Sequence, residues 1–235
     1  MKIIKGDIHD EIKKIETDSI NLIYSDVPFG ITSNKKWDIP LRYDELWSDM
    51  WRILKDNGAV VIHTSMPFTF DLVATQRKYF KYFWIWKKSN STNFFLAKKQ
   101  PLRITEEICV FYKKQPVYNP QMIGNTFYKK RNVTYGGKDK YYGECKNKEN
   151  KIITDGGHTG RYPTNFLEYN IRKSKKTDKN TASTRPDELV DFIIKTYSNE
   201  GDMIFDLTCY DALTGRRSEL LNREYIGVDL NPIIV

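Results

Sequence analysis

Short apolar runs alternate with segments of helical period along the first 112 residues, and this alternation most constrains the fold. Ser19 to Ser25 and Ala59 to Thr64 have the length and composition of buried strands. Between them, apolar residues recur at helical spacing over residues 43–54, and Asn57-Gly58 is expected to end that helix. Two further strands are expected at residues 84–86 and 108–112.

The same alternation returns near the end of the chain. Pro186 is expected at the first position of a helix with acidic residues in its first turn. A strand at 203–207, a short helix at 214–222 and a last strand ending in Asp229 follow. Strands separated by helices predict an α/β fold with a mostly parallel, doubly wound sheet.

The excess positive charge of the chain lies entirely in the segment between these two parts. Residues 113–179 contain 16 Lys and Arg against 6 Asp and Glu, whereas the remainder contains 22 against 24. Such a segment is typical of a surface that contacts phosphates, and equally of a solvated loop region. Charge alone does not separate these two interpretations.

Several classes of protein are disfavoured by composition. The three cysteines are widely spaced and form no zinc or redox motif, and the three histidines are scattered, so no metal site is expected. No apolar run approaches the roughly 18 residues of a membrane span, and the N-terminus does not resemble a signal peptide. We therefore expect a protein with no membrane partner in a cytoplasmic setting, the interior of a bacterial, phage-infected or virus-infected cell.

One motif follows the first strand, at the sheet edge where doubly wound folds bind ligands. The motif Asp26-Val27-Pro28-Phe29 resembles the Asp-Pro-Pro-Tyr motif of DNA amino-methyltransferases, which use S-adenosylmethionine to methylate an exocyclic amine of a base. Gly6-Asp7 precedes the motif, and Trp37-Asp38, residues 54–58 and residues 106–113 follow it in the order of that family. The likeness extends from about residue 2 to residue 229.

The resemblance implies a Rossmann-like fold and a defined chemistry for the motif. The base amine is a poor nucleophile, and acceptors on its two N–H bonds stabilise the charge that develops during transfer. The carboxylate of Asp26 is one expected acceptor, and the carbonyl of Val27, directed by Pro28, is the other. The ring of Phe29 is expected to stack on a base flipped out of the duplex.

The order of the motifs resembles the beta class of this family, with the catalytic motif first and the cofactor-binding strand last. The resemblance then makes residues 113–180 an inserted target-recognition segment within a single methyltransferase domain of residues 1–235. Double-stranded DNA is the implied partner and adenine N6 the implied target. The cations expected to contact DNA are Lys129, Lys130, Arg131, Lys138 and Lys140.

The cofactor-binding half departs from the family pattern. The glycine-rich turn after the strand that ends near Asp206 is replaced by Tyr210-Asp211-Ala212. We expect the ring to enter the cofactor pocket and Asp211 to repel the cofactor carboxylate, both weakening S-adenosylmethionine binding. The positions that the resemblance still assigns to the cofactor are Asp7, Ser183, Arg185, Asp206 and Asp229.

Three functions therefore stay open at the level of sequence. The first is an active DNA adenine methyltransferase with unusual cofactor loops. The second is a catalytically impaired DNA-binding subunit, a decayed relative that supports an active methyltransferase in a homodimer or heterodimer. The third is an N4-cytosine or RNA-directed methyltransferase, since a stacking ring accepts any base.

Overall fold

The structure is a computed structural model that describes residues 1–31, 38–135, 138–139, 143–144, 151–171 and 185–233. The chain divides into two compact units. The first comprises Met1–Asn119 and Thr164–Val235, and the second comprises Pro120–Pro163.

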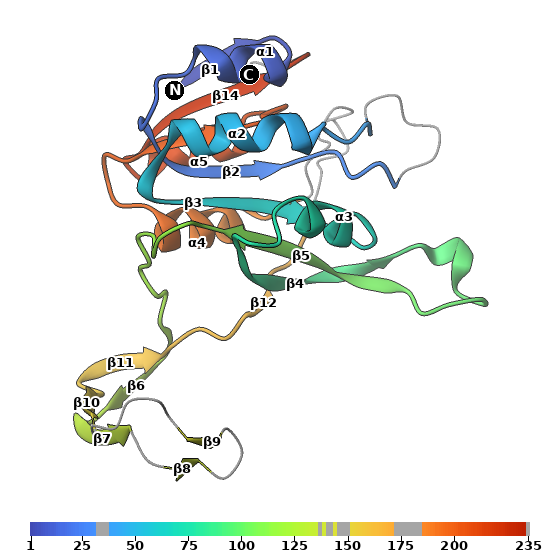
Figure 1. The fold of residues 1–235 in the computed structure, drawn as a ribbon. Coiled ribbons are helices and arrows are strands. Elements are labelled where there is room, and N and C mark those ends of the chain that lie inside the picture. The colour runs from blue at the N-terminus through green and yellow to red at the C-terminus, as the bar shows by residue number, and fades with distance from the viewer. Residues whose placement is uncertain (32–37, 136–137, 140–142, 145–150, 172–184, 234–235) are drawn as a thin grey trace. The chain divides into compact units, whose positions relative to one another are not determined.

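The first unit is built on an eight-stranded sheet with the order β1-β14-β13-β2-β3-β5-β4-β12 (Figure 1). Every neighbouring pair is parallel except the two made by β5, which is antiparallel to β3 and β4. The strands are β1 (Lys2–Lys5), β2 (Ile20–Asp26), β3 (Leu54–Thr64), β4 (Phe80–Thr92), β5 (Arg103–Phe111), β12 (Phe166–Glu168), β13 (Met203–Asp206) and β14 (Glu224–Asp229). The mostly parallel sheet expected from the sequence is confirmed.

Helices cover both faces of this sheet, as a doubly wound fold requires. One apolar cluster joins one face to α1 (Ile8–Glu11), the 3-10 turn η1 (Ile12–Lys14), α2 (Tyr43–Ile53) and α3 (Phe68–Thr75). A second cluster joins the other face to α4 (Asp187–Tyr197) and α5 (Leu213–Leu220). Residues 20–25 of β2 are buried throughout, because this central strand is covered on both sides.

Asn57-Gly58 does not end α2, contrary to the sequence-based expectation. The helix ends at Ile53, and Leu54 already has an extended backbone. Asn57 and Gly58 both lie inside β3. Gly58 is required there because a Cβ atom would come within 2.8 Å of the Asn21 carbonyl oxygen. At the other predicted helix, Pro186 is the N-cap of α4, one residue before its first turn.

The second unit consists of short antiparallel pairs. Strand β6 (Ile123–Tyr128) pairs with β11 (His158–Arg161), β7 (Arg131–Tyr135) with β10 (Lys151–Asp155), and β8 (Lys138–Asp139) with β9 (Gly143–Glu144). The sequence analysis predicted no strand within residues 113–180, and the structure has these strands there. Besides these strands, β12 lies within residues 113–180 and joins the main sheet beside β4.

The described residues contain neither a membrane-spanning helix nor a cluster of metal ligands. None of their helices combines the length and the apolar character needed to cross a membrane. They also contain no group of three or more His, Cys, Asp or Glu side chains placed to hold a metal ion.

Candidate active site

Carboxylates from four neighbouring strands gather at the carboxyl edge of the sheet. Strands β2, β13 and β14 run parallel and end at Asp26, Asp206 and Asp229. The neighbouring strand β1 leads into Asp7, which is the N-cap of α1. The topology thus brings together four of the sequence-predicted residues, from both ends of the chain.

Asp26 is held by groups from the far end of the sequence. The hydroxyl of Thr208 donates to the Asp26 carbonyl oxygen at 3.0 Å, and Nη2 of Arg185 donates to Oδ1 at 2.5 Å. The side chain of Asp26 remains 36% exposed, so the carboxylate faces the outside of the sheet edge. The backbone and the side chain of this residue are therefore both held by hydrogen bonds, and Arg185 sets the orientation of the carboxylate through Oδ1.

The loop that follows Asp26 is fixed by Asp38. One carboxylate oxygen of Asp38 accepts from the backbone N–H groups of Phe29 and Gly30, each at 2.8 Å. Gly30 has a φ of +68°, and a Cβ atom there would collide with the ring of Pro40. Asp38 is buried, which makes it a structural anchor of the motif rather than a surface carboxylate.

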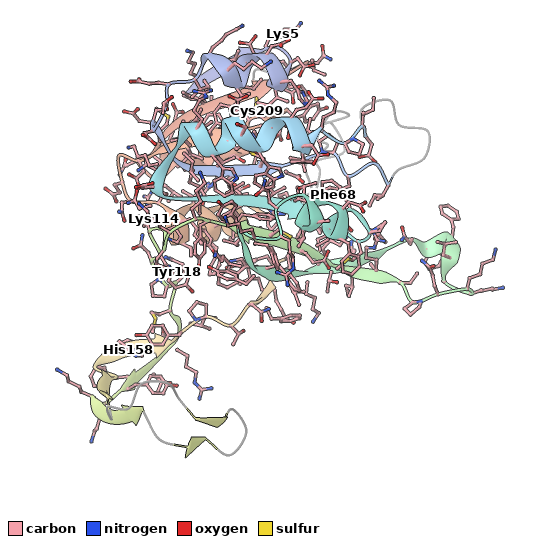
Figure 2. All side chains as sticks on the ribbon, viewed as in Figure 1. Lys5, Phe68, Lys114, Tyr118, His158 and Cys209 are labelled. Carbon is pink, nitrogen blue, oxygen red and sulfur yellow. The ribbon has the colours of Figure 1, made fainter. Side chains whose placement is uncertain are left out.

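The aromatic residue of the motif packs on the protein. The ring of Phe29 stacks on that of Phe68, with centroids 5.7 Å apart and an interplanar angle of 25°. Phe68 begins α3 and is labelled in Figure 2. Tyr43 packs against the same Phe68 ring. Phe29 is half-buried, and its orientation is set by this aromatic group.

Arg185 belongs to a network of buried charges. Its Nη1 lies 3.0 Å from Oε2 of Glu106, and the other oxygen of Glu106 accepts from Lys88 at 2.9 Å. The guanidinium carbon lies 5.3 Å from the ring centre of Trp86, which is fully buried. Arg185, Glu106 and Lys88 are themselves buried, so each charge depends on its partner. Two carboxylates and two cations balance one another.

The ionisation of Asp26 depends on this network. Burial raises the pKa of Asp26, and the charge of Glu106 raises it further. The adjacent Arg185 opposes both effects, since it favours the charged carboxylate. The pKa of Asp26 is raised overall. Because Arg185 limits this rise, it is the group that keeps the Asp26 carboxylate ionised and able to accept hydrogen bonds.

A neutral pair lies beneath the charges. The hydroxyl of Tyr24 and Nε2 of His63 are 2.8 Å apart, and both residues are buried. Burial holds the pKa of His63 well below its usual range and that of Tyr24 well above its own. Neither ring therefore adds charge to the site at neutral pH.

The turn that replaces the glycine-rich loop keeps a left-handed backbone. Tyr210 has a φ of +34° and Ala212 a φ of +53°. Both are positions where glycine would be unstrained, and a residue with a Cβ atom costs about 1 kcal/mol there. The turn is tied to β14 by the Tyr210 N–H, which donates to Oδ2 of Asp229 at 3.0 Å.

Asp211, expected from the sequence to repel the cofactor carboxylate, has a cationic partner within the turn. Its side chain is buried, and Oδ1 accepts from the N–H of Leu213 at 3.2 Å. Nη2 of Arg216 lies 3.8 Å from Oδ2, and the same side chain donates to the Asp211 carbonyl. The carboxylate is neutralised inside the turn, because α5 supplies a cation one turn beyond it.

The remaining carboxylates differ in their surroundings. Asp206 is buried, and burial raises its pKa to about 7, although it accepts from the Tyr225 hydroxyl at 3.1 Å and the Thr208 N–H at 3.2 Å. Asp7 is half-exposed and accepts from the His9 N–H, which lowers its pKa. Asp206 therefore belongs to the polar core, whereas Asp7 is open to a ligand.

The structure places the other predicted residues as follows. Arg185, assigned from sequence to the cofactor, contacts Asp26 and Glu106. Lys129 and Lys130 are exposed in the second unit. Arg131 lies in β7 and Lys138 in β8, whereas Ser183 and Lys140 lie outside the described residues.

Sequence reasoning missed the roles of Glu106, Lys88 and Asp38. Lys88 and Glu106 are charged residues within strands whose inner positions are otherwise apolar, and a charge there needs a buried partner. That pattern is a usable signal for a buried ion pair, but it does not say which cation meets which carboxylate.

The fold defines the class of protein: an α/β protein of the Rossmann-like methyltransferase type, with an acidic motif at the carboxyl edge of its sheet. The sequence matches the N6_N4_Mtase family model, described as DNA methylase, over residues 20–235. The chain therefore belongs to this family of DNA methylases.

Individual relatives agree with this assignment. The chain is 26% identical to the DNA adenine methyltransferase YhdJ of Escherichia coli strain K12, an alignment that covers 97% of this chain and 78% of the relative. Its fold is similar to that of the cytosine-N4-specific PvuII DNA methyltransferase, with a TM-score of 0.68 at 15% identity, covering 98% and 82% of the two chains. It is also similar to M1.HpyAVI bound to SAM, with a TM-score of 0.58 at 18% identity, covering 97% and 92%.

Proposed function

We propose that this DNA methylase transfers a methyl group from S-adenosylmethionine to the N6 amine of a flipped adenine, with Asp26 as the essential acceptor. The observation that carries the proposal is the fixed, half-exposed carboxylate of Asp26 at the sheet edge, directed by Arg185. The adenine target is supported by the relative named a DNA adenine methyltransferase.

Asp26 and the Val27 carbonyl act on the amine from two sides. Arg185 occupies Oδ1 of Asp26, which leaves Oδ2 to accept one amine N–H bond. The Val27 carbonyl accepts the other N–H bond, and Asp38 keeps the following loop in place. These acceptors draw the lone pair out of conjugation and stabilise the positive charge that develops on nitrogen. After transfer the nitrogen carries a positive charge and is acidic, and it loses one proton to water.

Phe29 supplies the face on which the base rests. Because Phe68 supports the ring of Phe29 from within the protein, the ring is already oriented before a base arrives. A preoriented platform reduces the entropy that binding must overcome. Base flipping requires such a platform, since the flipped base loses its stacking partners in the duplex.

The residues present fit S-adenosylmethionine, which supplies the transferred methyl group. Asp229 has both oxygens anchored by backbone N–H groups, those of Tyr210 and Asn231, and a carboxylate retains further lone pairs for ribose hydroxyls. The turn at Tyr210 has the left-handed backbone that a glycine-rich turn adopts, and Asp211 is neutralised by Arg216. Asp7, open at the end of β1, is assigned to the adenine end of the cofactor.

The test is methyl transfer by the full chain to duplex DNA, read out by mass spectrometry of the released nucleosides. We expect N6-methyladenine from the parent chain, and a loss of roughly 100-fold or more in turnover for Asp26→Ala with DNA binding retained. Asp56→Ala, which removes an exposed carboxylate paired with Lys114, is the matched control and should be silent.

Other outcomes separate the alternatives. N4-methylcytosine as the product would reassign the target base, and methylation of RNA alone would reassign the substrate. The strained backbone of Tyr210 and Ala212 favours a second candidate, a DNA-binding subunit with impaired cofactor binding. DNA binding without S-adenosylmethionine binding in calorimetry, and without product, would support that subunit and overturn the enzyme.

A further inference from the structure

Strands β4 and β5 continue past the end of β3 and form a projecting arm, which we define as residues 88–106. The last residue of β3, Thr64, pairs with Glu107, and Glu107 pairs with Ile85. Everything between Ile85 and Glu107 therefore extends beyond the end of β3, on the carboxyl side of the sheet. Figure 1 shows the two strands running on together to the helical turn η2 (Phe94–Leu96) at the tip.

The tip of the arm exposes large apolar side chains. Phe95 is 100% exposed, Phe94 77% and Leu96 38%. Exposing adjacent phenylalanines to water is unfavourable, and a cluster of this kind is typical of a surface that meets a partner. No residue from 89 to 101 is buried, so these side chains are not part of a core.

The tip nevertheless has a defined backbone. Asn93 adopts the left-handed conformation with a φ of +65° and starts the turn, and the N–H of Leu96 donates to its carbonyl at 2.8 Å. The N–H groups of Lys99 and Gln100 both donate to the Leu96 carbonyl. These hydrogen bonds hold the apolar side chains at the end of the arm without burying them.

Charge identifies the partner. Residues 88–105 contain no acid, and Lys98 and Lys99 follow the apolar tip and are exposed. Two copies of this arm placed together would bring like charges into contact, which opposes self-association. An apolar wedge beside cations fits DNA, where phosphates attract the lysines and a partly unstacked base step receives the rings.

The position of the arm agrees with that partner. The arm leaves the sheet at the same edge at which Asp26 ends β2. Its first and last residues supply Lys88 and Glu106, which join Arg185 in the network that holds Asp26. A contact between the arm and DNA is therefore linked to the catalytic carboxylate through these ion pairs.

We propose that the arm inserts Phe94 and Phe95 into a base step of duplex DNA while Lys98 and Lys99 contact the flanking phosphates. This inference rests on the proposed DNA substrate and adds a contact surface outside the second unit. The wedge assists removal of the target base from the stack, because a step opened by an apolar side chain has already lost part of its stacking.

The experiment uses the full chain and duplex DNA that carries 2-aminopurine near the target. For Phe94→Ala with Phe95→Ala, we expect Kd to rise about tenfold and the fluorescence increase to vanish, with the salt dependence unchanged. For Lys98→Ala with Lys99→Ala, the slope of log Kd against log salt should fall by about two. Leu220→Ala, an exposed apolar residue at the far end of α5, is the control and should match the parent.

The proposal is overturned if the double phenylalanine variant keeps the Kd and the fluorescence of the parent. It is also overturned if the variant changes only the oligomeric state in light scattering, or only the binding to anionic phosphatidylserine vesicles. Failure of the proposed catalytic function is separate: Asp26→Ala would then transfer methyl groups at the parent rate while the arm variants still lost DNA affinity. Thermal melting confirms that the exposed substitutions leave the fold intact.

Discussion

Replacing Arg185 with glutamine should move the pH profile of methyl transfer. Arg185 lowers the pKa of Asp26 against the opposite effects of burial and Glu106. Without the cation, the pKa of Asp26 rises, and a protonated, uncharged carboxyl is a weaker acceptor for the amine N–H bond. The acid limb of kcat/KM should therefore move to higher pH.

The substitution of Glu106 gives a test of opposite sign. The charge of Glu106 raises the pKa of Asp26, so Glu106→Gln should move the acid limb to lower pH. Arg185→Lys keeps the charge but loses the planar guanidinium that contacts Asp26 and Glu106 together. The acid limb of this variant should lie between those of the parent and of Arg185→Gln. Opposite shifts from two neighbours are not produced by general damage to the fold.

Stability has to be separated from this effect. Breaking a buried ion pair costs about 3–5 kcal/mol, and the lower end applies here because Asp26 is 36% exposed. Arg217 offers a matched control for the loss of a partly buried ion pair, since its Nη2 lies 2.5 Å from Asp191 on α4. Arg217→Gln should lower the unfolding free energy without moving the acid limb.

The assay is methyl transfer at subsaturating duplex DNA between pH 5 and 9, where the rate reports kcat/KM, with the unfolding free energy of each variant measured in urea. An unmoved acid limb in Arg185→Gln, or shifts of the same sign in Arg185→Gln and Glu106→Gln, would refute the role given to Arg185.

Three further predictions concern other parts of the chain. Alanine at the three consecutive cations Lys129 to Arg131 should weaken DNA binding for all sequences and flatten its salt slope by up to about three, as measured by fluorescence anisotropy at several salt concentrations. Glycine at Tyr210 and Ala212 should relieve left-handed strain of about 1 kcal/mol each and raise S-adenosylmethionine affinity about tenfold by calorimetry; tight binding by the parent would contradict this. Asp206 has a pKa of about 7 in the folded protein, above its unfolded value, so the folded state binds the extra proton and stability falls as pH rises from about 4 to 7; Asp206→Asn should remove this fall in urea unfolding.

Much of the fold could be predicted because its signals are local. Strand β2 is an apolar run, and α2 has its apolar side chains at helical spacing, so both follow from short windows of sequence. Asn57-Gly58 misled because a helix-ending pair occurs just as readily within an extended strand, where Gly58 avoids a neighbouring carbonyl. The three-residue strand β12 has too short a pattern to be detected, and only its pairing with β4 defines it.

Within the candidate site, too, residues with a local sequence signal could be predicted and contacts between distant residues could not. Asp26 could be predicted because it ends a strand, and the sheet edge follows from that position. The pairing of Arg185 with Asp26 spans 159 residues, and no local pattern specifies a contact over that distance. The neutralisation of Asp211 by Arg216 was missed because it depends on how α5 begins after the turn.

The strand order has a consequence for how the chain folds during its synthesis. Strands β13 and β14 lie between β1 and β2, although the ribosome makes them some 180 residues after β2. Until they emerge, no strand joins β1 to β2. The Asp26 carbonyl also lacks its hydrogen-bond donor, the hydroxyl of Thr208. Contacts over such separations form slowly, because a long loop must first close. A nascent chain therefore carries its acidic motif without a working site, and competence begins only when the last strands fill the gap.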